Sequence, residues 1–317
     1  MAIEAWDGYW RQAQEASAHR AGGPHEHLLI EFWTGLFRER LSNRHILRLV
    51  DIACGNGAVL EYFASSVAQM GGPRPAIMAV GMDGSGAAVA ELRRRQPGVG
   101  VVVAEVRCAP FAPGSFDLVT SQFGVEYGGV DAPLEAARLV GEGGMLALVL
   151  HLKHGGIYRE CAINLQAIQA MYDLMPLARE TLDAGIAASH GAGVPAVFQS
   201  ADRRFALGVA AVEDVFRKFG KEVAGGLIFR LYADIGHIYK KLGHFSQDEV
   251  EHWLGRMGGE LDAYRDRMAG MLNSALDRDQ LRELGRNFEC AGLNVTRSQA
   301  LSLGSQGEAA WSMVAGR

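Results

Sequence analysis

Residues 49–57 read Leu-Val-Asp-Ile-Ala-Cys-Gly-Asn-Gly, an apolar run that ends in a turn with two glycines. The run predicts a short buried strand, and the residues from Ala58 onward predict a helix directly behind the turn. Glycine has no Cβ, so a turn at Gly55 and Gly57 bends tightly and lets a ligand approach the backbone. Because the first N–H groups of a helix are unpaired and lie at its positive end, the pattern favours an anionic or polar, nucleotide-like ligand.

Two nucleotide-type ligands fit such a turn. A dinucleotide-binding turn carries a third glycine or alanine three residues after the second, where helix and strand pack together. Here that position is Leu60. Asp51, four residues before Gly55, adds a carboxylate that can accept hydrogen bonds from an amino group or, alternatively, order the turn by accepting its own N–H groups; it would repel a pyrophosphate. The turn therefore favours a cationic nucleoside that carries an amino acid over NAD.

The segment around this turn resembles the first motif of class I S-adenosylmethionine-dependent methyltransferases, of the UbiE-like type that acts on small molecules. Further segments resemble that family in the same order along the chain. They are 79–85 (AVGMDGS), 101–106 (VVVAEV), 109–119 (APFAPGSFDLV), 121–124 (SQFG), 137–145 (ARLVGEGGM) and the final AGLNV and WSMVA stretches. The resemblance implies an α/β fold with a doubly wound, seven-stranded, Rossmann-like sheet, and S-adenosyl-L-methionine as the cofactor.

The resemblance also assigns roles to residues at the strand ends. Asp83 would hold the ribose hydroxyls; its alternative role is to cap the following helix, for which Ser85 is better suited. Glu105 stands at the adenine position, where the family often carries an aspartate. Tyr9 and Trp10 share a helix face, which indicates either core packing or a helix that closes over the cofactor. The residues expected to bind the cofactor are Asp51, Ala53, Cys54, Gly55, Asn56, Asp83, Gly84, Glu105, Val106, Gln122, Phe123, Tyr9 and Trp10.

The order of expected elements divides the chain into three parts. Residues 1–45 predict an N-terminal helical cap, and residues 46–154 with 277–317 predict the cofactor-binding core. Residues 155–276 read as successive helices, with Pro176 as an expected kink or break. Since parallel sheets bind ligands at the carboxyl ends of their strands, we expect this helical insert to form a lid and a substrate pocket.

Three residues are candidates for catalysis. His151 follows the expected fifth strand, where it could deprotonate a hydroxyl or amine, or could satisfy loop backbone groups instead. Glu126 and Tyr127 follow the fourth strand and could bind an ammonium group or orient a hydroxyl; helix capping or packing is the alternative. Methyl transfer from a sulfonium depends mainly on position and alignment, so a base is an optional part of this site.

Composition limits the partners. The formal net charge of −5 disfavours a nucleic-acid partner. The four cysteines are scattered without a CxxC pair, which fits reduced thiols, and the pair His25 and His27 has no ligand partner at metal-binding spacing, so we expect no metal. No apolar run approaches the ~20 residues of a membrane span, and the N-terminus shows no signal peptide. We expect a cytoplasmic protein without a membrane partner.

These observations favour methyl transfer to an O, N or C atom of a small-molecule acceptor. Methylation of a tRNA or a protein is a second interpretation, which would require a basic groove beside the site. A third is a non-catalytic S-adenosylmethionine-binding protein whose helical insert serves a homodimer. Residues 121–124, SQFG, stand where DNA amino-methyltransferases carry an Asn/Asp-Pro-Pro-aromatic tetrad, which counts against DNA methylation.

Overall fold

The computed structural model describes residues 3–12, 26–41, 46–71, 76–302, 304 and 307–317. The chain divides into two compact units. The first contains the residues up to Glu160 and those from Gly270 onward, and the second is Cys161–Ala269. Helices α6 (Gly156–Ser189) and α9 (Gln247–Ser274) have residues in both units.

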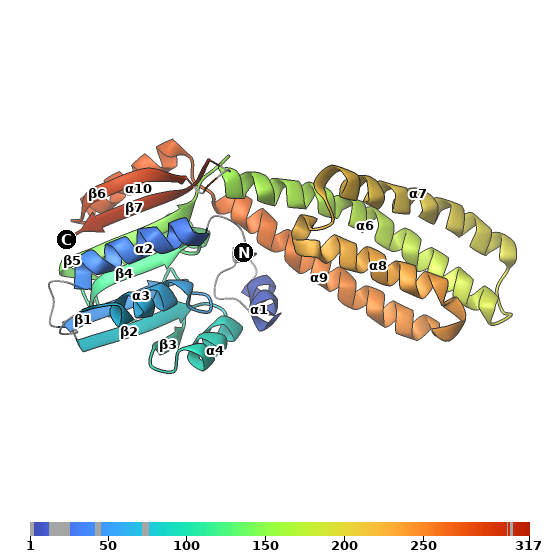
Figure 1. Ribbon diagram of the computed structural model, residues 1–317, viewed down its shortest axis with the longest axis horizontal. Helices are drawn as coiled ribbons and strands as arrows, with labels where there is room; N and C mark the ends of the chain where they lie inside the picture. The colour runs from blue at the N-terminus through green and yellow to red at the C-terminus, as the bar shows by residue number, and fades with distance from the viewer. Residues whose placement is uncertain (1–2, 13–25, 42–45, 72–75, 303, 305–306) are drawn as a thin grey trace. The chain divides into compact units, whose positions relative to one another are not determined.

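The first unit is built on a seven-stranded sheet in the order β3-β2-β1-β4-β5-β7-β6 (Figure 1). The five strands β1 to β5 are parallel, whereas β7 runs antiparallel to both β5 and β6. The predicted doubly wound, seven-stranded sheet is confirmed. The strands are β1 (Ile46–Ile52), β2 (Ala76–Asp83), β3 (Gly100–Val103), β4 (Phe116–Gln122), β5 (Val140–His151), β6 (Asn294–Ser302) and β7 (Glu308–Gly316).

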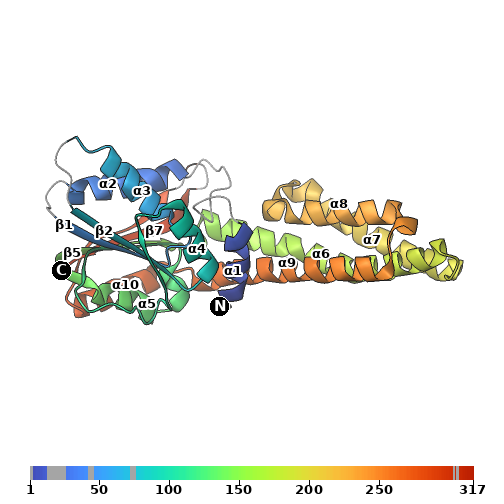
Figure 2. The ribbon, with the colours of Figure 1, turned by 90° about the horizontal axis from the view of Figure 1, so that it is seen from below.

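Helices cover both faces of this sheet, which explains why its central strands are buried along most of their length. Figure 2 shows α2 and α3 on one face and α5 and α10 on the other. Residues 116–121 of β4 and 144–151 of β5 are buried without alternation, as expected for a sheet covered on both sides. The helices assigned to this unit alone are α1 (Ile3–Gln12), α2 (Glu26–Leu41), α3 (Ala58–Ala68), α4 (Gly86–Arg95), the 3₁₀ turn η1 (Val125–Gly128), α5 (Asp131–Arg138) and α10 (Arg278–Cys290).

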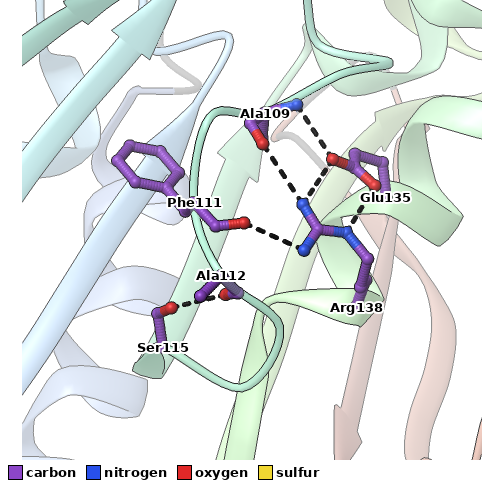
Figure 3. Close-up of polar contacts among 6 residues, drawn as sticks. All are labelled: Ala109, Phe111, Ala112, Ser115, Glu135 and Arg138. Carbon is purple, nitrogen blue, oxygen red and sulfur yellow. Dashed lines mark hydrogen bonds and ion pairs between the residues drawn. The ribbon is translucent and has the colours of Figure 1, made fainter.

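The loop before β4 is held by a partly buried ion pair on α5 (Figure 3). Arg138 donates from Nη1 to the carbonyl of Phe111 at 2.9 Å and from Nη2 to the carbonyl of Ala109 at 3.2 Å. Glu135 accepts from the backbone N–H of Ala109 at 2.9 Å and pairs with Arg138 at 2.6 Å. The hydrogen bonds from Arg138 hold the pKa of Glu135 below its usual value. One guanidinium therefore fixes the path of residues 109–111.

The second unit is helical and has its own apolar core. It contains α7 (Pro195–Phe219), α8 (Leu227–Lys240) and most of α6 and α9, namely residues 161–189 and 247–269, with short 3₁₀ turns at Val223–Gly226 and Leu242–His244. The expected break at Pro176 is wrong in part, because α6 continues through that proline to Ser189. In the described part of the chain no helix combines the length and apolarity needed to cross a membrane.

The two ends of the helical insertion are joined within the first unit. The backbone N–H of Leu276 donates to the carbonyl of His151 at 2.9 Å, and Lys153 donates to the carbonyl of Leu276 at 2.9 Å. Trp311 of β7 adds a hydrogen bond from its indole to the same Leu276 carbonyl at 2.8 Å. The chain thus leaves and rejoins the sheet at one place, immediately after β5.

Replacing Arg138 with alanine should lower the free energy of unfolding by about 1–3 kcal/mol, because two loop carbonyls and Glu135 lose their donor. Urea denaturation measures this loss. The control is Arg282→Ala, which removes an exposed ion pair with Asp279 and should change stability by less than ~0.5 kcal/mol. Equal effects of the two substitutions would contradict the role given to Arg138.

Candidate active site

A cavity of 560 Å³ opens at the carboxyl ends of the parallel strands in the first unit. Its volume lies within the ~300–1,000 Å³ of typical small-molecule sites. The turn after β1, the end of β2, the residues after β3 and β4, and two tryptophans of α1 contribute to it. From the residues predicted at the site, the lining includes Asp51, Ala53, Cys54, Gly55, Asp83, Gly84, Glu105, Val106, Gln122, Phe123, Trp10 and Tyr127.

The glycine turn has the backbone geometry that requires glycine. Gly55 and Gly57 have φ angles of 53° and 94°, in the left-handed region that side chains disfavour. A Cβ on Gly55 would lie 2.5 Å from a ring carbon of Trp10, so the indole of α1 rests directly on the turn. Ala53 also has a positive φ, 52°, and packs against Gly124 so closely that a Cβ there would lie 2.5 Å from its methyl group. The turn is therefore tightly fixed between α1 and the residue after Phe123.

Asp51 is a buried carboxylic acid in the wall of the cavity. Its side chain is 1% exposed, and Oδ1 accepts a hydrogen bond from Thr120 at 2.8 Å. Burial, with a smaller contribution from the charge of Asp83, raises the pKa of Asp51 to about 8. The group is therefore largely protonated at neutral pH, and a cation placed beside it would favour its ionised form.

Asp83 connects the turn after β1 to the start of α4. Its Oδ2 accepts from the backbone N–H of Gly55 at 2.8 Å, and its Oδ1 accepts from the N–H of Ser85 at 2.8 Å. Burial raises the pKa of Asp83 in spite of these hydrogen bonds. Ser85, as predicted, is the cap of α4, because its hydroxyl accepts from the N–H of Ala88 at 3.1 Å.

Helix α1 is attached to the same place by Asp7, which the sequence did not indicate. Its Oδ1 accepts from the hydroxyl of Ser85 at 2.5 Å and from the N–H of Ala87 at 3.0 Å. Asp7 and Asp83 are thus joined through Ser85. This contact keeps Trp6 and Trp10 in the cavity wall, whereas Tyr9 packs on both rings and is not part of the lining.

Other predicted cofactor residues have definite partners. Gln122 is held by the indole N–H of Trp33, which donates to its Oε1 at 2.7 Å. Glu105 and Arg107 form an ion pair at 3.1 Å at the cavity surface, where both side chains are more than half exposed. Asn56 is completely buried in the turn and does not line the cavity.

The three residues predicted for catalysis come together at the ends of β4 and β5. Nδ1 of His151 lies 2.7 Å from Oε1 of Glu126, and both side chains are buried. Tyr127 packs edge-on against the imidazole with ring centroids 5.8 Å apart. Tyr127 lines the cavity, but Glu126 and His151 lie behind the lining. The sequence placed these residues in the site without indicating that Glu126 and His151 form a pair.

Within the residues that the structure describes, no three His, Cys, Asp or Glu side chains approach one another as metal ligands would. His27 belongs to α2 and is exposed, and His25 lies outside the described residues.

Comparisons with known proteins agree with the architecture of the first unit. Residues 50–148 match the family described as "Methyltransferase domain". A curated relative is the malonyl-[acyl-carrier protein] O-methyltransferase of Enterobacter lignolyticus (strain SCF1), 31% identical over 110 residues, which are 34% of this chain and 40% of the relative. The chain thus matches about two fifths of that relative's length. The predicted methyltransferase domain is confirmed, with S-adenosylmethionine as its cofactor.

Two solved structures illustrate the partial likeness. An S-adenosylmethionine-dependent methyltransferase from Mesorhizobium loti is 22% identical, with 39% of this chain and 54% of that chain covered and a TM-score of 0.31. The geranyl diphosphate C-methyltransferase of Streptomyces coelicolor A3(2) is 16% identical, with 47% and 64% covered and a TM-score of 0.34.

Replacing Asp51 with asparagine should make the ligand-free protein more stable at neutral pH. The folded protein raises the pKa of Asp51 to about 8, so it binds a proton that the unfolded chain releases near pH 4. The wild-type protein therefore loses stability as the pH rises from ~4 to ~8. Urea unfolding at several pH values should show that the free energy of unfolding of the variant rises relative to that of the wild-type protein between pH ~4 and ~8, by a few kcal/mol at most. A difference that stays constant with pH would contradict this assignment.

Proposed function

We propose that this chain, whose residues 50–148 are a class I S-adenosylmethionine-dependent methyltransferase domain, transfers a methyl group from that cofactor to an O, N or C atom of a small molecule. The observation that carries the proposal is a pair of acids, the buried Asp51 and the partly buried Asp83, which line one cavity together with the glycine turn. Removing acids from water is costly, and a cationic ligand with vicinal hydroxyls gives both a partner.

The residues present fit this cofactor. Asp51 suits its amino group, since a nearby cation favours the ionised carboxylate. Asp83 suits the two ribose hydroxyls, and it lines the cavity together with Gly55 and Gly84. Glu105 and Val106, at the far side of the cavity, would face the adenine. When bound, the cofactor supplies a methyl group on a sulfonium, which is already activated for displacement.

The protein contributes alignment and exclusion of water. Trp6, Trp10, Phe123 and Tyr127 give the cavity an aromatic lining around its carboxylates. Such a wall holds the reacting groups in line and keeps water out, which are the main contributions that an enzyme makes to a displacement of this kind.

We assign acceptor binding to the helices of residues 155–276. The support is their place in the chain, since they follow β5 at the carboxyl edge of the sheet, where α/β proteins bind ligands. The apolar and aromatic residues of α6 to α9 would suit an aromatic or polyketide-like small molecule. The net charge of −5 disfavours a tRNA acceptor. Four free cysteines in the described chain support a reducing, cytoplasmic location.

Isothermal titration calorimetry tests cofactor binding. S-adenosylmethionine and S-adenosylhomocysteine should both bind the wild-type protein, and Asp83→Ala should weaken binding by about 5- to 150-fold, because the ribose loses a charged acceptor. Asp117→Asn is the matched control. It changes another buried carboxylate, which pairs with Arg48 at the opposite end of β4, and should leave the affinity unchanged. Absence of heat with both ligands would overturn the proposal.

A transfer assay tests the acceptor class. Deuteromethyl-labelled S-adenosylmethionine should label members of a panel of phenols, enols, amines and thiols, detected by mass spectrometry. Total tRNA and denatured protein are included as macromolecular acceptors. Label that appears only in tRNA or only in protein would contradict the small-molecule proposal and indicate methylation of that macromolecule instead.

A further inference from the structure

A carboxylate–imidazole pair lies directly behind the cavity wall. Glu126 is 4% exposed and His151 is 2% exposed. Oε1 of Glu126 is 2.7 Å from Nδ1 of His151 and also accepts the backbone N–H of His151 at 3.0 Å. Glu126 belongs to η1, which follows β4, and His151 is the last residue of the adjacent strand β5. The pair therefore joins the turn after β4 to the end of β5. Two hydrogen bonds to one oxygen fix the imidazole in place.

These contacts bear on the tautomer of the imidazole. An ionised carboxylate accepts hydrogen bonds and donates none. With Glu126 ionised and His151 neutral, the ring hydrogen lies on Nδ1, facing Glu126, and the lone pair lies on Nε2. A base must present such a lone pair, and an orienting carboxylate on the other nitrogen is the usual way to hold it there.

Two aromatic residues of the cavity wall pack against this pair. Phe123 and Tyr127 line the cavity, and their ring centroids lie 4.6 Å and 5.8 Å from that of the imidazole. Phe123 has a φ of 54°, in the left-handed region that a non-glycine residue rarely adopts. His151 is buried and is not part of the lining, so its contact with a molecule in the cavity would require this wall to rearrange.

We propose that Glu126 is a positioning residue that prepares His151 to deprotonate an acceptor hydroxyl, and that the acceptor is a phenol or an enol. This inference rests on the proposed methyl transfer and narrows its acceptor. A hydroxyl is a weak nucleophile until its proton is removed, whereas a neutral amine already offers a lone pair. A buried and oriented imidazole serves the first chemistry and is superfluous for the second.

In the proposed transfer, the proton, the methyl group and the electron pair of the broken bond each have a destination. The hydroxyl proton moves to Nε2 of His151 while the acceptor oxygen forms a bond to the methyl carbon. The bond between that carbon and sulfur breaks, and its electron pair stays on sulfur, which becomes a neutral thioether. The positive charge is then on the imidazolium, where the carboxylate of Glu126 stabilises it. The proton later passes to solvent.

Removing only the charge of Glu126 distinguishes a role in positioning and stabilising the imidazole from a role in holding the backbone. In Glu126→Gln the amide oxygen can still accept both hydrogen bonds, so the backbone connection is retained but the negative charge is lost. Asp117→Asn is the control, since Asp117 likewise accepts a backbone N–H and a side-chain donor from the neighbouring strand, both from Arg48. Tyr127 is a further titratable group beside the imidazole and stays unchanged in both variants.

The first readout is nitrogen-15 NMR of the histidine side chains in protein saturated with S-adenosylhomocysteine, with the His151 signal assigned from His151→Asn. We expect wild-type His151 to carry its neutral-state hydrogen on Nδ1. We expect Glu126→Gln to lose the imidazolium proton at a lower pH than wild type or Asp117→Asn. A neutral ring with its hydrogen on Nε2, or an unchanged titration in Glu126→Gln, would overturn the inference.

The second readout is kinetic and uses the panel compound that the wild-type protein methylates fastest. We expect a phenol or enol, a rise of kcat/KM with pH to a plateau, and an ascending limb that moves to lower pH in Glu126→Gln. His151→Asn should lower kcat by about 10²- to 10⁴-fold. Preference for amines, with a kcat that His151→Asn leaves unchanged, would overturn the inference while the proposed methyl transfer stands. Failure of cofactor binding would instead remove the proposed function itself.

Discussion

The hydrogen bond from the N–H of Gly55 to the carboxylate of Asp83 is the contact on which the site depends. It joins the turn after β1 to the end of β2 at 2.8 Å, so the two strand ends that would hold the nucleoside cannot separate. Through Ser85 the same carboxylate reaches the first turn of α4 and, beyond it, Asp7 of α1. One buried acid therefore sets the positions of a turn, a helix start and the helix that lines the cavity.

This arrangement works against the stability of the ligand-free fold. Asp51 and Asp83 are buried close enough that the charge of Asp83 contributes to the raised pKa of Asp51. Positive φ angles at Ala53 and Phe123 add backbone strain at the same edge of the sheet. The covered core of β4 and β5 supplies the stability that tolerates these features. A cationic partner for the two acids would offset this cost, and that relief would contribute to the affinity for such a ligand.

The sequence predicted the sheet well, because its signals are local. A strand covered on both faces is mostly apolar, and the segments 49–52 (LVDI), 79–83 (AVGMD) and 116–119 (FDLV) are each apolar except for one aspartate. The capping serine and the glycine turn are also local, since each acts on backbone within a few residues. No break occurs at Pro176, because the packing of the long helix α6, with Leu174 and Ala178 buried on either side of the proline, outweighs the loss of one hydrogen bond.

The pairs that complete the site could not be predicted in the same way. Trp33 and Gln122 are 89 residues apart in the chain, Asp7 and Ser85 are 78 apart, and Glu126 and His151 are 25 apart. The fold brings the two residues of each pair together, and their side-chain rotamers determine which atoms form the hydrogen bond. Topology did indicate that Glu126 and His151, which follow adjacent strands, would lie at one edge. That their side chains share a hydrogen bond depends on burial, since a carboxylate removed from water needs a donor and the imidazole beside it supplies one.

The two halves of the site use charge in different ways. On the donor side, Asp51 and Asp83 are aimed into the cavity, where a cation can meet them directly. On the proposed acceptor side the carboxylate of Glu126 lies behind Phe123 and Tyr127 and, in the proposed mechanism, acts through His151. From that position it would stabilise the imidazolium formed in the proposed step without a direct contact to the sulfonium.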